Sequence, residues 1–397
     1  MKKVLIASFD MEVGGVERSL ISMLNNFDYK NNKVDLMLYK HQGDLINLLP
    51  DKQNLLEEIS EYTTFRKTVK TIIDEKKYIL AITRVLANIN SKIIGKMRKI
   101  PEAGYYQMQL MWKYSLPFLP KLDKRYDVAI SYLWPHYFIA EKVMASKKIA
   151  WIHTDYSKIA IDTKLDLQMW NKFDYIISIS EECTKSFLIK YPSLKGKIIL
   201  VENITSPKFI RDSSEEEINE SALFKDYNFN IVSVGRLCYQ KGFDNAILAL
   251  KILIDKGYKD LKWYIIGYGG EQEKLTELIN RNNLQNNFIL LGKKVNPYPY
   301  IKKCHLYVQP SRYEGKAVTV TEAKILGKPV LITDYPTANS QLINGFDGVI
   351  CDNSVEGIVN GVENLYKNKK NRDELSKNCN RSDYSNSYEL EKLYKLF

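Results

Sequence analysis

Short apolar runs alternate with helical stretches along the chain, and this alternation constrains the fold more than any other feature. In the second half, each apolar run is followed by a stretch of helical periodicity. The runs are "FNIVSVGRL", "KWYIIGYG", "NFILLG", "LYVQPS", "PVLIT" and "GVICD", and helices are expected at 242–256, 271–282, 297–303, 318–326, 337–343 and 354–370. Strands separated by helices form a parallel, doubly wound α/β sheet. We therefore predict one such sheet in this half.

The first half repeats the pattern. "KKVLIASF" precedes a pair of glycines and the apolar positions Val16, Leu20, Met23, Leu24 and Phe27, which lie at helical spacing. The runs "KVDLMLY", "YDVAISYL", "KKIAWIHT", "FDYIISIS" and "KIILVEN" continue the series. A polar, charged segment at 206–228 predicts a linker with a short helix. The expected domains are therefore residues 1–205 and 206–384, and the amphipathic helix predicted at 385–397 is expected to pack back on the first domain.

Residues 53–125 are predicted to be a basic helical insert in the first domain. Apolar side chains recur there every three or four positions, at Ile79, Ile82, Leu86, Ile89, Ile93, Met97 and Ile100, and the remaining face carries Arg84, Lys92, Lys96, Arg98 and Lys99. Between Glu61 and Arg125 fourteen basic side chains stand against five acidic ones, which indicates an anionic partner. Two interpretations remain open: a helix packed on its own domain with a solvated face, or a surface helix on an anionic membrane. The two are compatible if neighbouring helices share these roles.

Composition restricts the class of protein and its compartment. A chain of 397 residues with 45% hydrophobic and 26% charged side chains is typical of a globular protein. The opening run VLIA is shorter than the roughly 7–15 apolar residues of a secretory signal, and no run approaches the roughly 18–20 of a spanning helix. The five cysteines are far apart, which argues against disulfides or a zinc site and favours a reducing compartment. We expect a cytoplasmic protein.

Functional side chains are expected where strands of the second sheet meet helices, because ligands of doubly wound domains bind beyond the carboxyl ends of the strands. "VGRLCYQKG" places Gly235 at a strand end and Arg236 and Lys241 before a helix. Two cations beside a helix N-terminus suit a pyrophosphate. "SRYEGKAVTVTEAKILGKPV" places Glu314 in a loop and Glu322 about one turn into a helix. Such carboxylates can each hold a diol, although surface cations and ordinary helix-start acids are the alternative interpretation.

Four further features lie at comparable junctions. The amides of Lys316, Ala317 and Val318 are predicted donors near a helix start. Gly14 and Gly15 in "MEVGGVE" permit a close approach of a ligand or simply a tight turn. His153 in "AWIHTD" ends a strand and is either functional or structural. "IIGYGGEQEKL" lacks the third glycine of a dinucleotide fingerprint, so we interpret it mainly as backbone packing.

Taken together and in this order, these stretches resemble the retaining glycosyltransferases of family 4. That family has the GT-B fold, in which two Rossmann-like doubly wound domains face each other across a cleft. The resemblance implies that residues 1–205 bind the acceptor and that residues 206–384 bind the nucleotide sugar. The resemblance is most specific over residues 230–352, whereas "GGVERSL", "WIHTD" and "SISE" match more loosely. Residues 50–125 match no family pattern, as expected if they contact a variable acceptor.

The resemblance implies a role for each of these residues. Arg236 and Lys241, beside Gly235, would neutralise the donor diphosphate and stabilise the departing nucleotide. Glu314 would contact the hydroxyls of the donor sugar, and His153 would reach that sugar near the reacting carbon. Glu322 would hold the nucleotide ribose, and the loop around Val295 would hold the base. The amides of Lys316, Ala317 and Val318 would contact sugar hydroxyls and the β-phosphate. Gly14 and Gly15 would lie against the diphosphate or the acceptor.

The sequence departs from the family pattern at one place. Many members have an aromatic residue and a glycine after the Glu-Gly pair, where this chain has Lys316 and Ala317. The amides are retained, but a cation is placed near the sugar, which leaves the identity of the donor open.

The resemblance therefore implies a hexosyltransferase that moves a sugar from a nucleotide-diphosphate sugar, a UDP-sugar in the first instance, to a growing surface glycan such as a capsule. Retention, a lipid-linked saccharide acceptor and peripheral attachment to the anionic inner face of the cell membrane are expected, without a metal, a cofactor or nucleic acid. Two alternatives are a nucleotide-sugar epimerase of the same fold and a non-enzymatic binder of anionic polymers.

Overall fold

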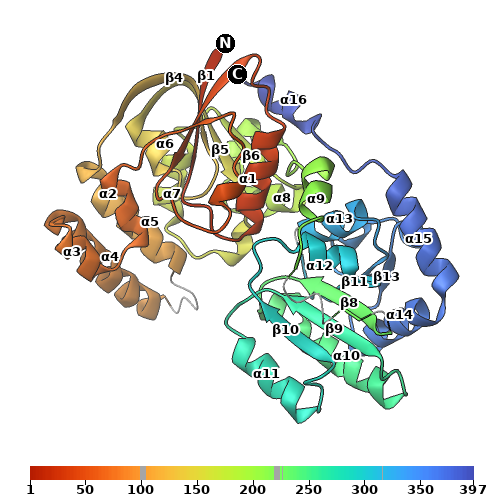
Figure 1. Ribbon diagram of the computed structural model, residues 1–397. Coiled ribbons are helices and arrows are strands. Elements are labelled where there is room, and N and C mark those ends of the chain that lie inside the picture. Colours follow the sequence, from red (N-terminus) through yellow and green to blue (C-terminus); the bar gives the residue numbers. More distant parts are fainter. Residues whose placement is uncertain (99–103, 219–223, 226, 315) are drawn as a thin grey trace. The chain divides into compact units, whose positions relative to one another are not determined.

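The structure, a computed structural model, describes residues 1–98, 104–218, 224–225, 227–314 and 316–397 (Figure 1). The chain divides into two compact units. Unit 1 comprises Met1–Ile204 together with Asn386–Phe397, and unit 2 comprises Thr205–Ser385. The helix α9 (Pro207–Ser213) in the predicted linker belongs to unit 2.

Unit 1 is built on a seven-stranded sheet with the order β3-β2-β1-β4-β5-β6-β7, and its strand pairs are parallel. The strands are β1 (Lys2–Ser8), β2 (Asn32–Leu38), β3 (Asn54–Leu55), β4 (Leu122–Ser131), β5 (Val143–Ile152), β6 (Tyr175–Ser178) and β7 (Ile198–Leu200). The predicted runs are therefore strands, and only the short β3 was not predicted. The strand order reverses between β1 and β4, which is where ligands of such sheets bind.

Helices connect and cover these strands. They are α1 (Gly15–Asn25), α2 (Ser60–Thr63), α3 (Val69–Asp74), α4 (Tyr78–Met97), α5 (Gly104–Ser115), α6 (Tyr137–Lys142), α7 (Thr163–Trp170), α8 (Glu181–Lys190) and α16 (Glu389–Tyr394). The tail helix α16 contacts the end of α1: the ring of Tyr394 lies 5.4 Å from that of Phe27, and its hydroxyl accepts a hydrogen bond from the amide of Asp28. The tail is thereby fastened to unit 1.

Unit 2 contains a six-stranded sheet with the order β10-β9-β8-β11-β12-β13, again with parallel pairs. The strands are β8 (Phe229–Val234), β9 (Leu261–Ile266), β10 (Phe288–Gly292), β11 (Leu306–Gln309), β12 (Val330–Thr333) and β13 (Val349–Cys351). The other helices of this unit are α10 (Phe243–Asp255), α11 (Gln272–Arg281), α12 (Tyr298–Lys303), α13 (Val318–Ile325), α14 (Val355–Lys367) and α15 (Lys369–Arg381). Both units thus have the strand order of the Rossmann fold, as predicted.

The structure departs from the predicted helices of unit 2 at two places. The helix expected at 337–343 is wrong, because only Ala338–Ser340 forms a 3₁₀ turn. Its flanking polar groups are bonded elsewhere: the Thr337 hydroxyl donates to the carbonyl of Glu314, and the Tyr335 hydroxyl donates to the side chain of Gln341. The helix expected at 354–370 is α14, which ends at Lys367, and the next helix α15, which the Asn368 side chain caps, was not predicted.

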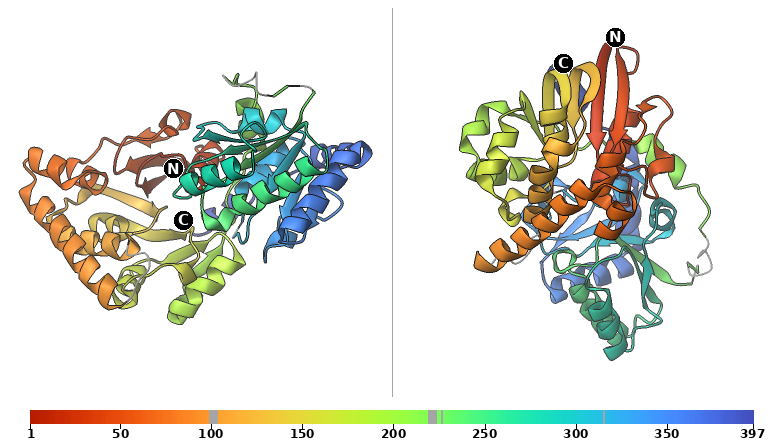
Figure 2. Two further views of the ribbon diagram at one scale, coloured as in Figure 1. Left: turned by 90° about the horizontal axis from the view of Figure 1, so that it is seen from below. Right: turned by 90° about the vertical axis from the view of Figure 1, so that its left-hand side faces the viewer.

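The amphipathic helix of the insert is α4, and its apolar stripe faces outward. Six of the predicted apolar positions are 47–79% exposed, namely Ile79, Ile82, Leu86, Ile89, Ile93 and Met97. The buried face is made mostly of small residues such as Ala87, Ser91 and Gly95, and it packs against α5, where the hydroxyls of Thr83 and Ser115 are 3.0 Å apart. Figure 2 shows this group of orange helices side by side within unit 1. The helix therefore packs on its own domain, as one interpretation predicted, but through its small residues and not through its apolar stripe.

The basic residues predicted for the solvated face of α4 do not all lie there. Lys92, Lys96 and Arg98 are exposed. Arg84 does not belong to the solvated face, because its guanidinium donates to the carbonyls of Thr64 and Lys67, and burial lowers its pKa to about 10. Lys99 and Ile100 lie outside the described residues.

Candidate active site

Four of the residues predicted to bind the donor lie in unit 2 where its strand order reverses, between β8 and β11. The loop after β8 carries Gly235, Arg236 and Lys241, and the loop after β11 carries Glu314. Because β8 and β11 are neighbouring parallel strands, their carboxyl ends lie at the same edge of the sheet. This is the position at which doubly wound domains bind nucleotides.

A buried ion pair joins the two loops. The Nζ of Lys241 lies 2.5 Å from Oε1 of Glu314, and the two side chains are 16% and 6% exposed. The same carboxylate accepts hydrogen bonds from the Ser311 hydroxyl at 2.6 Å, the Gln309 amide at 3.3 Å and the Gln240 amide at 3.4 Å. Glu314 is therefore no ordinary surface acid, and its position is set by donors from both loops.

Three glycines allow the loops at this edge to approach one another closely. Gly242 has a positive φ of 65°, and a side chain there would clash with the carbonyl oxygen of Pro310. Side chains at Gly267 and Gly269 would clash with the backbones of Gly235 and Leu237. The prediction that "IIGYGGEQEKL" serves mainly backbone packing is thus confirmed.

The cations of this edge differ in their surroundings. Arg236 is exposed, and within the described part of the chain no ion pair is formed by its guanidinium. The stem of Lys241 lies over Gly235. Arg312, which sequence reasoning did not single out, donates two hydrogen bonds of 2.8 and 2.7 Å to the carboxylate of Asp244 and lies 4.1 Å from the ring centroid of Tyr239. Arg312 therefore fastens the loop after β11 to the start of α10.

The other predicted donor residues of unit 2 lie around α13 and after β10. Glu322 is buried within α13 and accepts a 3.0 Å hydrogen bond from the Tyr298 hydroxyl. Ala317 precedes Val318, the first residue of α13, so the amides of its first turn lie at a helix N-terminus. Lys316 is partly buried beside them. Val295 is 37% exposed in the loop after β10, an outer strand of this sheet.

Gly14 and Gly15 lie at the start of α1 in unit 1. Gly14 is the N-cap in extended conformation, and a side chain there would meet the Glu17 carboxylate, whereas Gly15 borders open space. Glu17 was not predicted, although it belongs to the same "GGVE" stretch. Burial, reinforced by the charge of Asp10, raises the pKa of Glu17 to about 7. The ligand role of the two glycines stays a prediction.

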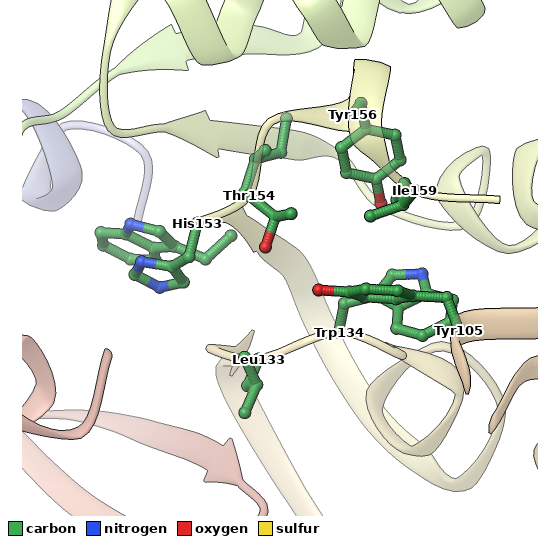
Figure 3. Close-up of a pocket in the computed structure, with 9 residues that line it drawn as sticks. Tyr105, Leu133, Trp134, His153, Thr154, Tyr156 and Ile159 are labelled. Carbon is green, nitrogen blue, oxygen red and sulfur yellow. The ribbon is translucent and has the colours of Figure 1, made fainter. Parts of the chain in front are cut away.

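His153 follows β5 and lines a shallow hollow in unit 1 (Figure 3). Burial lowers its pKa to about 3, so the ring is neutral at physiological pH. Tyr105 from α5 and Trp134 from the loop after β4 line the same hollow. Neither was predicted, because segments far apart in the sequence build the hollow, and only the position of Trp134 just after a strand could have indicated it.

Comparison with known proteins agrees with this architecture. The family model described as "Glycosyl transferases group 1" matches residues 213–382. An uncharacterized glycosyltransferase of Methanocaldococcus jannaschii is 36% identical over 47% of this chain and 46% of its own length. The capsular polysaccharide biosynthesis glycosyltransferase CapM of Staphylococcus aureus is 28% identical over 59% of this chain and 61% of its own. The N-acetylgalactosamine-N,N'-diacetylbacillosaminyl-diphospho-undecaprenol 4-alpha-N-acetylgalactosaminyltransferase of Campylobacter jejuni is 33% identical over 44% and 50%.

These relatives match in part only, since the chain spans roughly half the length of two of them and 61% of the third. Solved structures match over the whole chain. HepE of Anabaena in complex with UDP-glucose has a TM-score of 0.68 at 15% identity, covering 100% of this chain and 99% of that one. A mutant of TarM from S. aureus has a TM-score of 0.69 at 16% identity with the same coverage. At such identities the likeness shows the fold alone, which is the GT-B fold. Together the comparisons support a transferase enzyme.

Within the described ranges, the chain contains no helix with both the length and the hydrophobicity that crossing a bilayer requires.

Proposed function

We propose that this protein is a retaining glycosyltransferase of family 4 that moves a hexose-type sugar from a UDP-sugar to a lipid-linked surface glycan. The observation that carries the proposal is the Lys241–Glu314 pair at the point of unit 2 where the strand order reverses. A cation and a carboxylate held together there suit the two parts of a nucleotide sugar, the diphosphate and the sugar hydroxyls. The similarity to a capsular and to a diphospho-undecaprenol glycosyltransferase supports the choice of acceptor.

The proposed chemistry rests on leaving-group stabilisation. The bond between the anomeric carbon and the diphosphate oxygen breaks, and an acceptor hydroxyl attacks the same face of the sugar. Its proton passes to the departing phosphate. Arg236 and Lys241 offset the charge that develops on the leaving group, and Glu314 orients the sugar through its hydroxyls. Because these cations carry that charge, the proposal calls for no metal, and transfer is expected to survive excess EDTA.

Ligand binding tests the nucleotide assignment. UDP and a panel of UDP-sugars should raise the melting temperature, because a ligand that binds only the folded state stabilises it. Arg236→Ala and Lys241→Ala should each reduce this shift, whereas Lys274→Ala, an exposed cation on α11, should not. A protein that no UDP compound stabilises would contradict the proposal.

Product analysis then separates transfer from epimerisation. With a lipid-linked saccharide acceptor, the enzyme should release UDP and lengthen the acceptor with retention at the anomeric carbon. A nucleotide-sugar epimerase would instead return an altered UDP-sugar without any acceptor. A binder of anionic polymers would give neither product.

We further propose that α4 attaches the enzyme to an anionic membrane surface. Its outward apolar stripe suits the boundary between head groups and acyl chains, and the exposed Lys92, Lys96 and Arg98 lie on the same helix. Lipid head groups are therefore the partner that matches both its apolar and its charged side chains. Such attachment would bring the enzyme to an acceptor that is itself held in the membrane.

A further inference from the structure

The loop after β11 is fastened by several contacts of Arg312 besides its ion pair with Asp244. The guanidinium also donates to the carbonyl of Tyr239 at 2.7 Å and to the side chain of Asn245 at 3.2 Å, and it lies 4.1 Å from the centroid of the Tyr239 ring. These partners belong to the loop after β8 and to the first turn of α10. Because the guanidinium is planar and its donors are forked, such a set of partners fixes its orientation as well as its position.

The backbone around Arg312 is bonded to groups outside its own loop. The Arg312 amide donates to the carbonyl of Gln240 at 2.8 Å, and the Gln240 side chain donates to the carbonyl of Tyr313 at 3.0 Å. The carbonyl of Arg312 accepts from the Asn353 side chain at 3.1 Å. Peptide groups outside helices and sheets depend on partners of this kind. The course of the chain up to Glu314 is therefore set by contacts across the sheet edge.

The loop after β8 depends less on Arg312. The Leu237 amide donates a 3.0 Å hydrogen bond to the carbonyl of Tyr268, which lies on the neighbouring loop after β9. Lys241 lies in a 3₁₀ turn that leads directly into α10. Loss of the Arg312 guanidinium should therefore leave Lys241 near its place, whereas the chain that carries Glu314 loses its anchor.

The placement of Glu314 matters for the proposed chemistry. Its carboxylate is assigned to the hydroxyls of the sugar, and a misplacement of about 1 Å can lower a rate about 100-fold. Groups that hold such a carboxylate from behind are needed for this precision although they do not touch the substrate. Arg312 suits this task better than a contact with the diphosphate, because the carboxylate of Asp244 already offsets its charge.

We propose that Arg312 is a positioning residue, which holds the loop after β11 so that Glu314 meets the sugar of the donor at the correct place. The inference rests on the proposed glycosyl transfer, in which Arg236 and Lys241 take the diphosphate. Loss of Arg312 should therefore lower kcat for sugar transfer and leave the binding of UDP, which carries no sugar, unchanged. Loss of a cation that binds the diphosphate would weaken UDP binding itself.

Hydrogen–deuterium exchange of the ligand-free, full-length protein tests the anchor without any substrate. Arg312→Ala and Asp244→Asn should each speed exchange of the amides at 311–314 by roughly 10-fold or more, because local opening becomes easier. Asp244→Asn keeps the size of the side chain, so it retains the test if Arg312→Ala does not fold. The matched control is Arg281→Ala, which removes an arginine paired with Glu277 on α11 and should exchange there as wild type does. Exchange at the wild-type rate in both site variants overturns the proposal.

Transfer kinetics then test the consequence for the reaction. Arg312→Ala and Asp244→Asn should lower kcat about 10–100-fold, whereas Arg281→Ala should not, and the UDP-induced shift in melting temperature should match wild type in all three. Added guanidinium ion should restore part of the kcat of Arg312→Ala, since it can bind between Asp244 and the Tyr239 ring. Arg312→Lys should stay slow, because an ammonium group lacks the planar fork.

The two measurements distinguish this inference from the proposed function. A wild-type kcat in Arg312→Ala, or a loss of its UDP-induced shift, overturns the positioning role. Failure of every UDP compound to bind wild type overturns the proposed function instead, and the exchange experiment still decides whether Arg312 anchors the loop.

Discussion

Lys241 and Glu314 form an ion pair of 2.5 Å although more than seventy positions separate them in the sequence. The ion pair links the loop after β8 to the loop after β11. Because further donors from Gln240, Gln309 and Ser311 hold the carboxylate, both charges have fixed positions before any ligand binds. Such preorganisation is what a site for an activated diphosphate needs, since it avoids reorganisation during the reaction.

Two substitutions separate the contribution of this ion pair to the stability of the fold from its contribution to sugar transfer. Glu314→Gln should lower transfer about 100-fold or more and should destabilise the fold by about 1–3 kcal/mol, because the ammonium group of Lys241 loses its acid. Adding Lys241→Met should restore part of the stability, since no charge is then left unpaired, while transfer stays lost. Urea unfolding and a transfer assay measure the two effects. If the double variant recovered activity along with stability, the proposed roles of both residues would be wrong.

Gly242 should not accept a side chain without a loss of stability. Gly242→Ala forces a left-handed backbone on alanine, at a cost of roughly 1–2 kcal/mol, and adds a clash with the Pro310 carbonyl. Gly345→Ala is the matched control, because Gly345 has a φ of 79° but borders open space. The free energy of unfolding should therefore fall further for Gly242→Ala than for Gly345→Ala. Equal losses would show that the clash is relieved at little cost.

The order of strands and helices was predictable because buried parallel strands leave continuous apolar runs. The same rule placed Arg236, Lys241 and Glu314 at strand ends, and the structure brings Lys241 and Glu314 together there. Gln309 and Gln240, which help to hold Glu314, were not predicted, because nothing in their local sequence distinguishes them from ordinary polar residues. Their role depends on the spacing between two loops.

Periodicity also could not tell which way α4 faces. A helix with one apolar stripe has the same pattern whether that stripe is buried or exposed. What decides is the opposite face, where Ala87, Ser91 and Gly95 are small enough to pack closely against α5. The hollow with Tyr105 and Trp134 could not be predicted from the sequence, because α5 and the loop after β4 come together only in the folded chain.

Glu17 should make the stability of the fold depend on pH. Its pKa is raised from 4.5 to about 7, mainly by burial, with Asp10 and Glu12 adding to the rise and Arg66 opposing it. The folded state therefore keeps a proton that the unfolded state releases, so this contribution to stability is present below about pH 4.5 and is lost as the pH rises through about 7. Glu17→Gln should be more stable than wild type at pH 8, by up to about 3 kcal/mol, and equally stable at pH 4.

Urea unfolding of both proteins at several pH values measures this difference. Glu182→Gln, which changes an exposed glutamate on α8, should show no comparable change between pH 4 and pH 8. A Glu17→Gln variant whose stability relative to wild type does not vary with pH would contradict the raised pKa.

The outward stripe and the cations of α4 should both be needed for membrane attachment. Replacing Lys92, Lys96 and Arg98 by Glu should weaken binding to anionic vesicles by 100-fold or more, since each basic residue near such a surface contributes about 1 kcal/mol. Replacing Ile82, Leu86 and Ile89 by Gln should also weaken binding, because these exposed side chains would no longer bury apolar area among the acyl chains. A control with the same change in net charge replaces Lys164, Lys185 and Lys195, which are exposed elsewhere in unit 1, by Glu. This control should sediment more like wild type.

Co-sedimentation with phosphatidylglycerol and phosphatidylcholine vesicles measures these effects. If the charge-reversed helix binds as wild type does, the membrane is not the partner of α4, and if only the apolar variant binds normally, attachment is purely electrostatic and the stripe has another role.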